Sequence, residues 1–210
     1  MLKNPRLVAL LVFAACQLQA QQPQFRGYRK SELPAGWKWE KNTLTRVADG
    51  GDIITNDTYE NFELTLEWKI SEGGNSGIFF HVVEDSSHGY AYETGPEMQV
   101  LDNTKHPDGK SPKTSAGADF DVHAVSRDVT KPVGEWNKVK LIVKGPHVEH
   151  WLNGVKVVEY ELWSDQWLRD VANSKFKDSK DFGRARSGHI ALQDHGNWVA
   201  FRNIKIKRLN

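Results

Sequence analysis

Apolar and polar residues alternate with a period of two along most of the chain after residue 36, and this pattern predicts short β-strands. It is clearest in residues 62–70, where Leu64, Leu66 and Trp68 are separated by charged or hydroxyl side chains. Residues 136–144, 148–152 and 155–160 show a similar pattern. The last two runs are joined by Asn153-Gly154, the sequence that a tight type I′ hairpin favours.

Other short runs predict the remaining strands, at residues 37–39, 43–47, 52–55, 75–82, 97–101, 119–125, 189–193 and 199–209. The one candidate helix lies within residues 161–182, where Ser164 or Asp165 can cap it and Trp167 and Val171 share a face. Short strands separated by turn residues are typical of antiparallel sandwiches. We therefore expect an all-β, two-sheet jelly roll with one short helix.

The first residues indicate export. Lys3 and Arg6 precede a short apolar run at 7–15, and small or polar residues follow, which predicts a signal peptide over residues 1–20. The run is too short to span a bilayer. In the alternative interpretation Cys16 is the lipid-modified residue of a lipoprotein, although Phe13 stands where Leu is usual. We expect a periplasmic or extracellular protein, with an extended lead-in at 21–36 and one domain at 37–210.

The composition excludes few functions, but it limits the kinds of partner that we expect. Lys and Arg total 28 against 27 acidic residues, so no charge excess favours nucleic acid or an anionic membrane. The chain has eight Trp, which suit sandwich cores and sugar-stacking surfaces alike. Its single cysteine, Cys16, lies in the leader, so we expect neither a disulfide nor thiol catalysis in the mature fold.

The strand at 97–101 carries the main candidate site. If Met98 and Val100 face the core, Glu97 and Gln99 share the opposite face, and Asp102 follows the strand end. A carboxylate and an amide on one sheet face, with a second carboxylate nearby, suit a sugar site. The alternative for Glu97 and Gln99 is an ordinary solvated face, and for Asp102 an ordinary turn residue.

A second set of polar residues follows the strand at 189–193. Gln193 and His195 alternate opposite Ile190 and Leu192, and a histidine can transfer protons near neutral pH. The alternative is a surface turn histidine. Weaker candidates for substrate contacts are Glu67, His81, and the loop residues Lys105 and His106.

Metal use is left open by the sequence. No residues have the spacing of a zinc site. Carboxylates and carbonyls can still hold a divalent cation of the calcium type without a fixed motif. Glu97 with Glu67 or Asp102 can also form the carboxylate pair of a conventional glycosidase.

Six motifs together resemble one known family: N-S-G-I-F-F at 75–80, G-P-E-M-Q-V-L-D-N at 95–103, G-E-W-N at 134–137, L-N-G at 152–154, L-Q-D-H-G at 192–196 and F-R-N-I-K-I at 201–206. From about Trp37 to the C-terminus the chain resembles the 3-keto-disaccharide hydrolase domain, also described as a 3-keto-glucoside 1,2-lyase/3-keto-2-hydroxyglucal hydratase. The resemblance implies a concanavalin A-like jelly roll exported by bacteria. The chain departs from the family at His81, where many relatives carry Arg, and at residues 118–121.

The resemblance also implies a reaction on a small sugar substrate, a 3-keto-glucoside. The C3 ketone acidifies the C2 proton, a base removes it, the C1 substituent leaves, and hydration completes a net hydrolysis. We expect Glu97 as the base and His195 as the acid or enolate donor. The ketone would be made by a separate oxidoreductase, and the absence of a G-x-G-x-x-G fingerprint is consistent with that. A non-catalytic, lectin-like carbohydrate-binding module is the alternative function.

Overall fold

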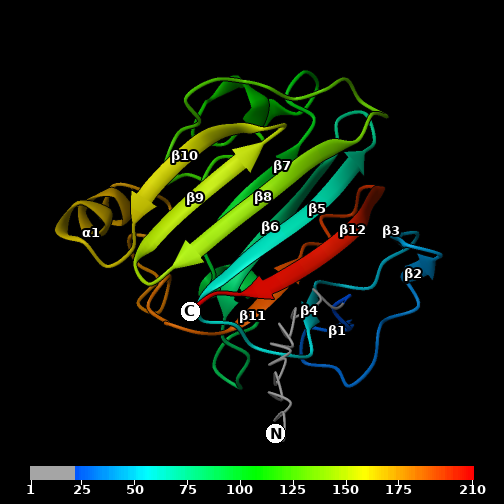
Figure 1. The fold of residues 1–210 in the computed structure, drawn as a ribbon, viewed down its shortest axis with the longest axis horizontal. Helices are drawn as coiled ribbons and strands as arrows, with labels where there is room; N and C mark the ends of the chain where they lie inside the picture. Colours follow the sequence, from blue (N-terminus) through cyan, green and yellow to red (C-terminus); the bar gives the residue numbers. More distant parts are fainter. Residues whose placement is uncertain (1–21) are drawn as a thin grey trace, which may run out of the picture.

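The computed structural model describes residues 22–210, which form two antiparallel sheets packed face to face (Figure 1). The five-stranded sheet runs in the order β1 (Phe25–Gly27), β4 (Ile53–Thr55), β11 (His189–Leu192), β6 (Asn75–Val82) and β7 (Glu97–Leu101). The seven-stranded sheet runs in the order β10 (Val155–Glu161), β9 (His147–Leu152), β8 (Asn137–Lys144), β5 (Phe62–Ile70), β12 (Val199–Arg208), β3 (Thr43–Arg46) and β2 (Trp37–Glu40). The expected all-β jelly-roll sandwich is confirmed.

The main core lies between the two sheets and is built by the alternating positions. In β5, every second residue from Phe62 to Ile70 is buried, and the residues between them are only partly covered. In the facing sheet, Ile78 and Phe80 of β6 and Met98 and Val100 of β7 enter the same core. Each such side chain contributes about 1.5–3 kcal/mol by leaving water, so this alternation fixes which face of β7 is turned inward.

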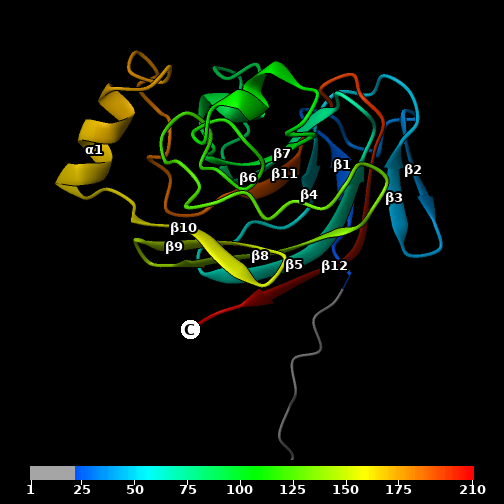
Figure 2. The ribbon, with the colours of Figure 1, turned by 90° about the horizontal axis from the view of Figure 1, so that it is seen from above.

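The other face of the five-stranded sheet is also covered. A second apolar cluster on it contains Tyr28, Ile54, Phe79, Val82, Ala91 and Ala191. Figure 2 shows the connection that follows β7, together with α1 (Asp165–Ala172), on the side of the molecule away from the seven-stranded sheet. That connection contains the 3₁₀ turn η2 (Pro107–Lys110), and η1 (Ala91–Glu93) precedes β7. Side chains on this face of β7 are therefore enclosed by loops.

The N-terminal elements differ slightly from the sequence expectation. The lead-in expected at 21–36 supplies β1, which pairs with β4 through Arg26 and Ile54. The expected signal peptide and Cys16 lie outside the described residues. In the part of the chain that the structure describes, no helix has the length and apolarity needed to cross a membrane.

The strand predicted at 119–125 was wrong. The chain turns back on itself there, because the backbone N–H groups of Val122 and His123 both donate to the Asp119 carbonyl. Only isolated bridges join Asp119 to Met98 and to His123. The buried Asp119 carboxylate also binds the His123 ring, so local polar contacts replace a strand ladder.

The predicted helix exists but is short. Ser164 is its N-cap and accepts a hydrogen bond from the Trp167 N–H at 3.1 Å. Trp167 is buried, as expected from its apolar face. The residues after Ala172 form turns in which Phe176 and Phe182 stack, with ring centroids 3.8 Å apart. The helix ends at Ala172 with Asn173 as its C-cap, well before residue 182.

The β9–β10 hairpin has the predicted two-residue turn, with Asn153 at φ 50° and Gly154 at φ 83°. A Cβ at Gly154 would meet nothing within 4 Å, so the cost of Gly154→Ala is purely conformational. We expect a loss of about 1–2 kcal/mol in the free energy of unfolding, measured by urea denaturation. Gly89→Ala is the matched control, because its added Cβ meets only Glu93 Oε1 at 3.7 Å and its φ is not positive. Equal stability of the two variants would contradict the turn assignment.

Candidate active site

Glu97 begins β7 and is buried, although it carries a carboxyl group. It is 4% exposed and lies on the loop-covered face, opposite Met98. In the register of the sheet it pairs with Phe79, and Gln99 pairs with Gly77. A carboxyl group in such surroundings loses most of its hydration, which favours the neutral acid.

Gly77 makes room for the Glu97 carboxyl. A Cβ placed on Gly77 would overlap Glu97 Oε1 and come within 2.8 Å of Glu97 Cδ. The carboxyl group therefore lies directly over the bare backbone of β6. Gly77 is not in a left-handed conformation, so the close approach, and not backbone strain, is the reason a glycine fits here.

The electrostatics around Glu97 move its pKa toward neutrality. Burial is the largest cause, and with the nearby carboxylates of Asp52, Asp108 and Asp119 it raises the pKa to about 8, against the opposing effect of the Lys175 ammonium. A carboxyl group with such a pKa can accept a proton near neutral pH and is a far stronger base than an exposed glutamate.

Lys175 lies in the segment that follows α1, and its positive charge acts on the Glu97 carboxyl without forming an ion pair with it. Its backbone N–H donates to Asp121 Oδ2 at 2.6 Å, and its ammonium lies 3.9 Å from the centroid of the Phe120 ring. Burial of the charged group lowers the pKa of Lys175, although Glu97 acts in the opposite direction. The residue as a whole is exposed, so its ammonium reaches the site from the surface.

Asp119 links the site to helix α1. Its Oδ2 lies 2.8 Å from His123 Nδ1, and His123 Nε2 lies 3.3 Å from Asp170 Oδ2 in the helix. These contacts raise the pKa of His123 above its ordinary value despite the lowering effect of burial. Asp119 Oδ1 is buried without a hydrogen-bond partner. The Asp119 carboxylate is one of the charges that raise the pKa of Glu97.

Asp52 approaches from the β4 side of the sheet. Its Oδ1 accepts a hydrogen bond from the Asp194 N–H at 2.9 Å, and burial raises its pKa to about 6. Asp194 in turn pairs with Arg46 and accepts from the Gly50 and Gly51 N–H groups at 2.8 and 3.0 Å. The buried Arg46–Asp194 pair thus fixes the two loops that carry Asp52 and His195.

Gln193 and His195 lie where the alternation placed them, after β11 on the loop-covered side. The Gln193 N–H donates to the Gly77 carbonyl at 3.0 Å, so Gln193 is next to the glycine that supports Glu97. Its Oε1 is buried and has no partner. His195 is exposed, and its ring meets that of His106 edge to face at 6.4 Å.

Gln99 and Asp102 are buried but already engaged. Gln99 Nε2 donates to the Thr114 carbonyl at 3.3 Å, and its Oε1 accepts from the Val100 N–H at 3.0 Å. Asp102 accepts from the Gly73 N–H at 2.8 Å and from the Thr104 hydroxyl at 2.6 Å. Both side chains hold loops against β7, so a sugar contact would require them to exchange these bonds.

The remaining candidates lie elsewhere. Glu67 binds Arg202 at 2.6 Å on the outward face of the seven-stranded sheet. His81 sits at a bulge with φ 53°, where its Nε2 lies 2.8 Å from the Glu60 carbonyl and its ring packs on Phe80. Lys105, with Asp102, lines a cleft of about 380 Å³ that Glu97 does not line. Glu97 and Gln193 both lie next to Gly77, and His195 lies next to His106, whereas Glu67, His81 and Lys105 take part in neither group of contacts.

Sequence reasoning missed Asp52, Asp108 and Lys175. Asp52 and Ile54 share a strand face by alternation, and Ile54 belongs to the loop-side cluster, so the pattern contained a signal for Asp52. Lys175 had no such signal, because only the packing of Phe176 and Phe182 brings its segment back to β7. Within residues 22–210, three His or carboxylate ligand atoms within 4.8 Å of one another occur on the β9–β10 hairpin, and not around Glu97.

Comparison with known proteins gives matches over most of the chain. The sequence pattern of the 3-keto-alpha-glucoside-1,2-lyase-like domain matches residues 21–207. A protein of Bacteroides thetaiotaomicron described as a 3-keto-disaccharide hydrolase is 37% identical, over 89% of this chain and 74% of its own. A Parabacteroides distasonis crystal structure of a candidate glycosyl hydrolase superposes with a TM-score of 0.82 at 31% identity, covering 89% of this chain and 88% of its own.

A Bacillus subtilis carbohydrate-binding module superposes with a TM-score of 0.51 at 13% identity, over 81% of this chain and 90% of its own, which shows a shared fold alone. The domain match covers most of the chain, and the Bacteroides relative is similar over nearly the same length. The chain therefore belongs to the 3-keto-alpha-glucoside-1,2-lyase-like family.

Proposed function

We propose that this protein is an exported enzyme that cleaves 3-keto-glycosides by elimination across C1–C2 and hydration of the resulting enone. The observation that carries the proposal is the buried Glu97 carboxyl, whose pKa of about 8 makes it a base poised near neutral pH. Family membership supports a glycoside as the substrate. The leader at residues 1–20 supports export, with Cys16 as the attachment point if the leader is that of a lipoprotein.

In the first half-reaction the Glu97 carboxylate takes the C2 proton. The electron pair left on C2 is delocalised onto the C3 ketone oxygen, and it then forms the C1–C2 double bond as the C1–O bond breaks. The leaving oxygen takes a proton from an acid. In the second half-reaction the oxygen of a water molecule adds to C1, the remaining proton of that water returns to the acid that protonated the leaving oxygen, and the Glu97 carboxyl returns its proton to C2. The net change is hydrolysis of the glycoside, without oxidation or reduction.

The surrounding groups supply the remaining roles. The Lys175 ammonium is the positive charge that lowers the pKa of Glu97, and it is the candidate for stabilising negative charge on the enolate oxygen. Asp52, with a pKa of about 6, and His195 at the exposed side are the candidate acids for the leaving group. Gln193 offers an unpartnered carbonyl oxygen to a sugar hydroxyl.

The decisive assay uses a matched pair of substrates, a glucoside and its 3-keto derivative. We expect release of the aglycone, with transient enone absorbance, from the 3-keto compound alone, because only the ketone acidifies C2. Glu97→Gln should lower kcat by about 100-fold or more, the range for loss of a general base. Glu63→Gln, on the outward face of β5, is the control and should retain activity. Cleavage of the unoxidised glucoside would indicate a conventional glycosidase, and binding without turnover of either compound a lectin.

The pH profile should follow Glu97. The base is active when deprotonated, and its pKa is raised to about 8, so kcat/KM should rise tenfold per pH unit and level off above about pH 8. Lys175→Met removes a charge that lowers this pKa, and Asp108→Asn removes one that raises it. We therefore expect the midpoint to move up in the first variant and down in the second. A midpoint near pH 4.5 in the unsubstituted enzyme, or shifts of the same sign, would contradict the assignment.

Gly77→Ala tests the position of the carboxyl. The new methyl group would occupy the place of Glu97 Oε1, so the carboxyl must swing away from the sheet. We expect kcat to fall by about tenfold or more, while far-UV circular dichroism stays unchanged. Gly89→Ala, whose Cβ meets no site residue, serves as the control and should leave kcat unchanged. Full activity of Gly77→Ala would show that the carboxyl need not lie over β6.

A further inference from the structure

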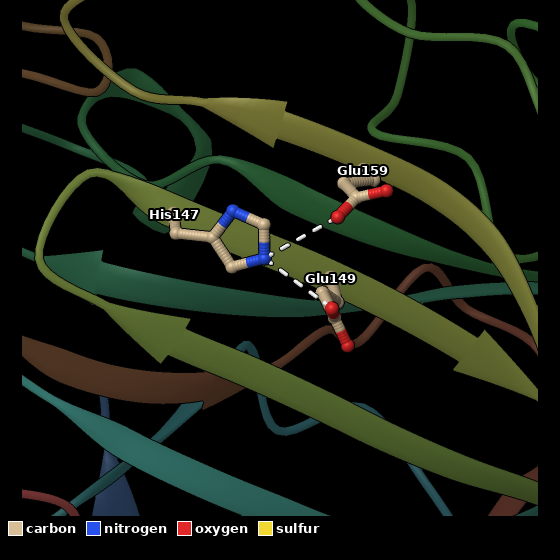
Figure 3. A group of neighbouring side chains, drawn as sticks. All are labelled: His147, Glu149 and Glu159. Carbon is tan, nitrogen blue, oxygen red and sulfur yellow. Dashed lines mark hydrogen bonds and ion pairs between the residues drawn. The ribbon is translucent and has the colours of Figure 1, made fainter.

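The outward face of the β9–β10 hairpin carries a second cluster of ligand-type side chains, separate from Glu97. His147, Glu149 and Glu159 each direct one atom toward the same point (Figure 3), and these three atoms lie within 4.8 Å of one another. His147 Nε2 is 3.3 Å from Glu149 Oε1 and 3.5 Å from Glu159 Oε1. Glu149 and Glu159 are directly opposed across the two strands.

These separations fit ligands around a small cation better than direct ion pairs. Charge-assisted hydrogen bonds bring nitrogen and oxygen to about 2.7–2.9 Å. In a tetrahedral zinc site with bonds of about 2.0–2.2 Å, by contrast, neighbouring ligand atoms are about 3.3–3.5 Å apart. The two distances from His147 Nε2 to the glutamate Oε1 atoms, 3.3 and 3.5 Å, fall in that range.

Each of the three ligands is also oriented by a partner on its other polar atom. Glu161 Oε1 lies 2.6 Å from His147 Nδ1, which leaves Nε2 turned toward the cluster. Trp151 Nε1 donates to Glu149 Oε2 at 2.6 Å, and Lys156 Nζ donates to Glu159 Oε2 at 2.6 Å. Such outer contacts fix the tautomer of a metal-binding histidine and the direction of the carboxylates.

The charges favour a cation in the same place. Like charges directly opposed on neighbouring strands destabilise a sheet, and here two carboxylates face each other with Glu161 alongside. Lys156 offsets part of this charge, since its ammonium also lies 3.4 Å from Glu149 Oε1. One imidazole nitrogen with two carboxylate oxygens suits zinc-type ions, whereas calcium and magnesium prefer ligand sets made of oxygen.

We propose that the hairpin binds one zinc-type divalent cation through His147 Nε2, Glu149 Oε1 and Glu159 Oε1, with water completing the coordination. The ion would tie β10, the edge strand of the seven-stranded sheet, to β9. It is independent of the reaction at Glu97, which lies on the outer face of the other sheet.

The test uses untagged, EDTA-treated protein titrated with ZnCl2 in a calorimeter, and with CaCl2 in parallel. We expect one equivalent of zinc to bind and to raise the thermal unfolding midpoint, with little effect of calcium. His147→Gln and Glu159→Gln should each weaken zinc binding by at least about tenfold, and so should Glu161→Gln through the orientation of His147. The control is His88→Gln, because His88 also contacts two carboxylates, Asp85 and Asp181, outside this cluster.

Circular dichroism of the zinc-free variants separates loss of the site from loss of the fold. Activity on the 3-keto substrate should be equal in His147→Gln and the unsubstituted protein, so this test stands apart from that of the proposed function. The inference is overturned if no zinc binds, if folded His147→Gln binds as tightly as the unsubstituted protein, or if His88→Gln causes the same loss.

Discussion

The enclosure of one carboxyl group over the bare backbone of a neighbouring strand is the constraint on which the site depends. Glu97 is 4% exposed, and it can lie over β6 because Gly77 has no side chain there. Removing a carboxyl group from water costs free energy mainly for the ionised form, so the fold raises its proton affinity. The same burial that disfavours the charge produces a base that operates near neutral pH.

The rest of the fold holds Glu97 and the charged groups around it in place. The core between the sheets fixes the face of β7 on which Glu97 stands, because Met98 and Val100 are buried in it. The stacked rings of Phe176 and Phe182 hold the segment that brings Lys175 to the site. On the other side, the buried Arg46–Asp194 pair fixes the loop that carries Asp52. The sheet therefore sets the position of Glu97, and the loops bring the charged groups that act on it.

The part of this picture that follows a simple periodicity could be predicted from the sequence. Alternation predicted the sandwich and placed Glu97 and Gln99 on one face, and the Asn153-Gly154 dipeptide predicted the hairpin turn. It could not show that the Gln99 amide is used by the Thr114 carbonyl, nor that Glu67 pairs with Arg202 on the opposite sheet. These outcomes depend on which loop covers which face. Residues 119–125 do not form the predicted strand for a related reason. The Asp119 carbonyl accepts the backbone N–H groups of Val122 and His123, and its carboxylate binds the His123 ring.

The most direct test of the central claim is the titration of the Glu97 carboxyl itself. Carbon-13 NMR of protein labelled at the glutamate carboxyl carbon, with Glu97→Gln to identify the resonance, reports its protonation without any substrate. We expect a midpoint at about pH 8, because burial and the neighbouring Asp carboxylates raise the pKa of Glu97 against the effect of Lys175. A midpoint near 4.5, the ordinary value of a glutamate, would show that the carboxyl is hydrated and would contradict the account.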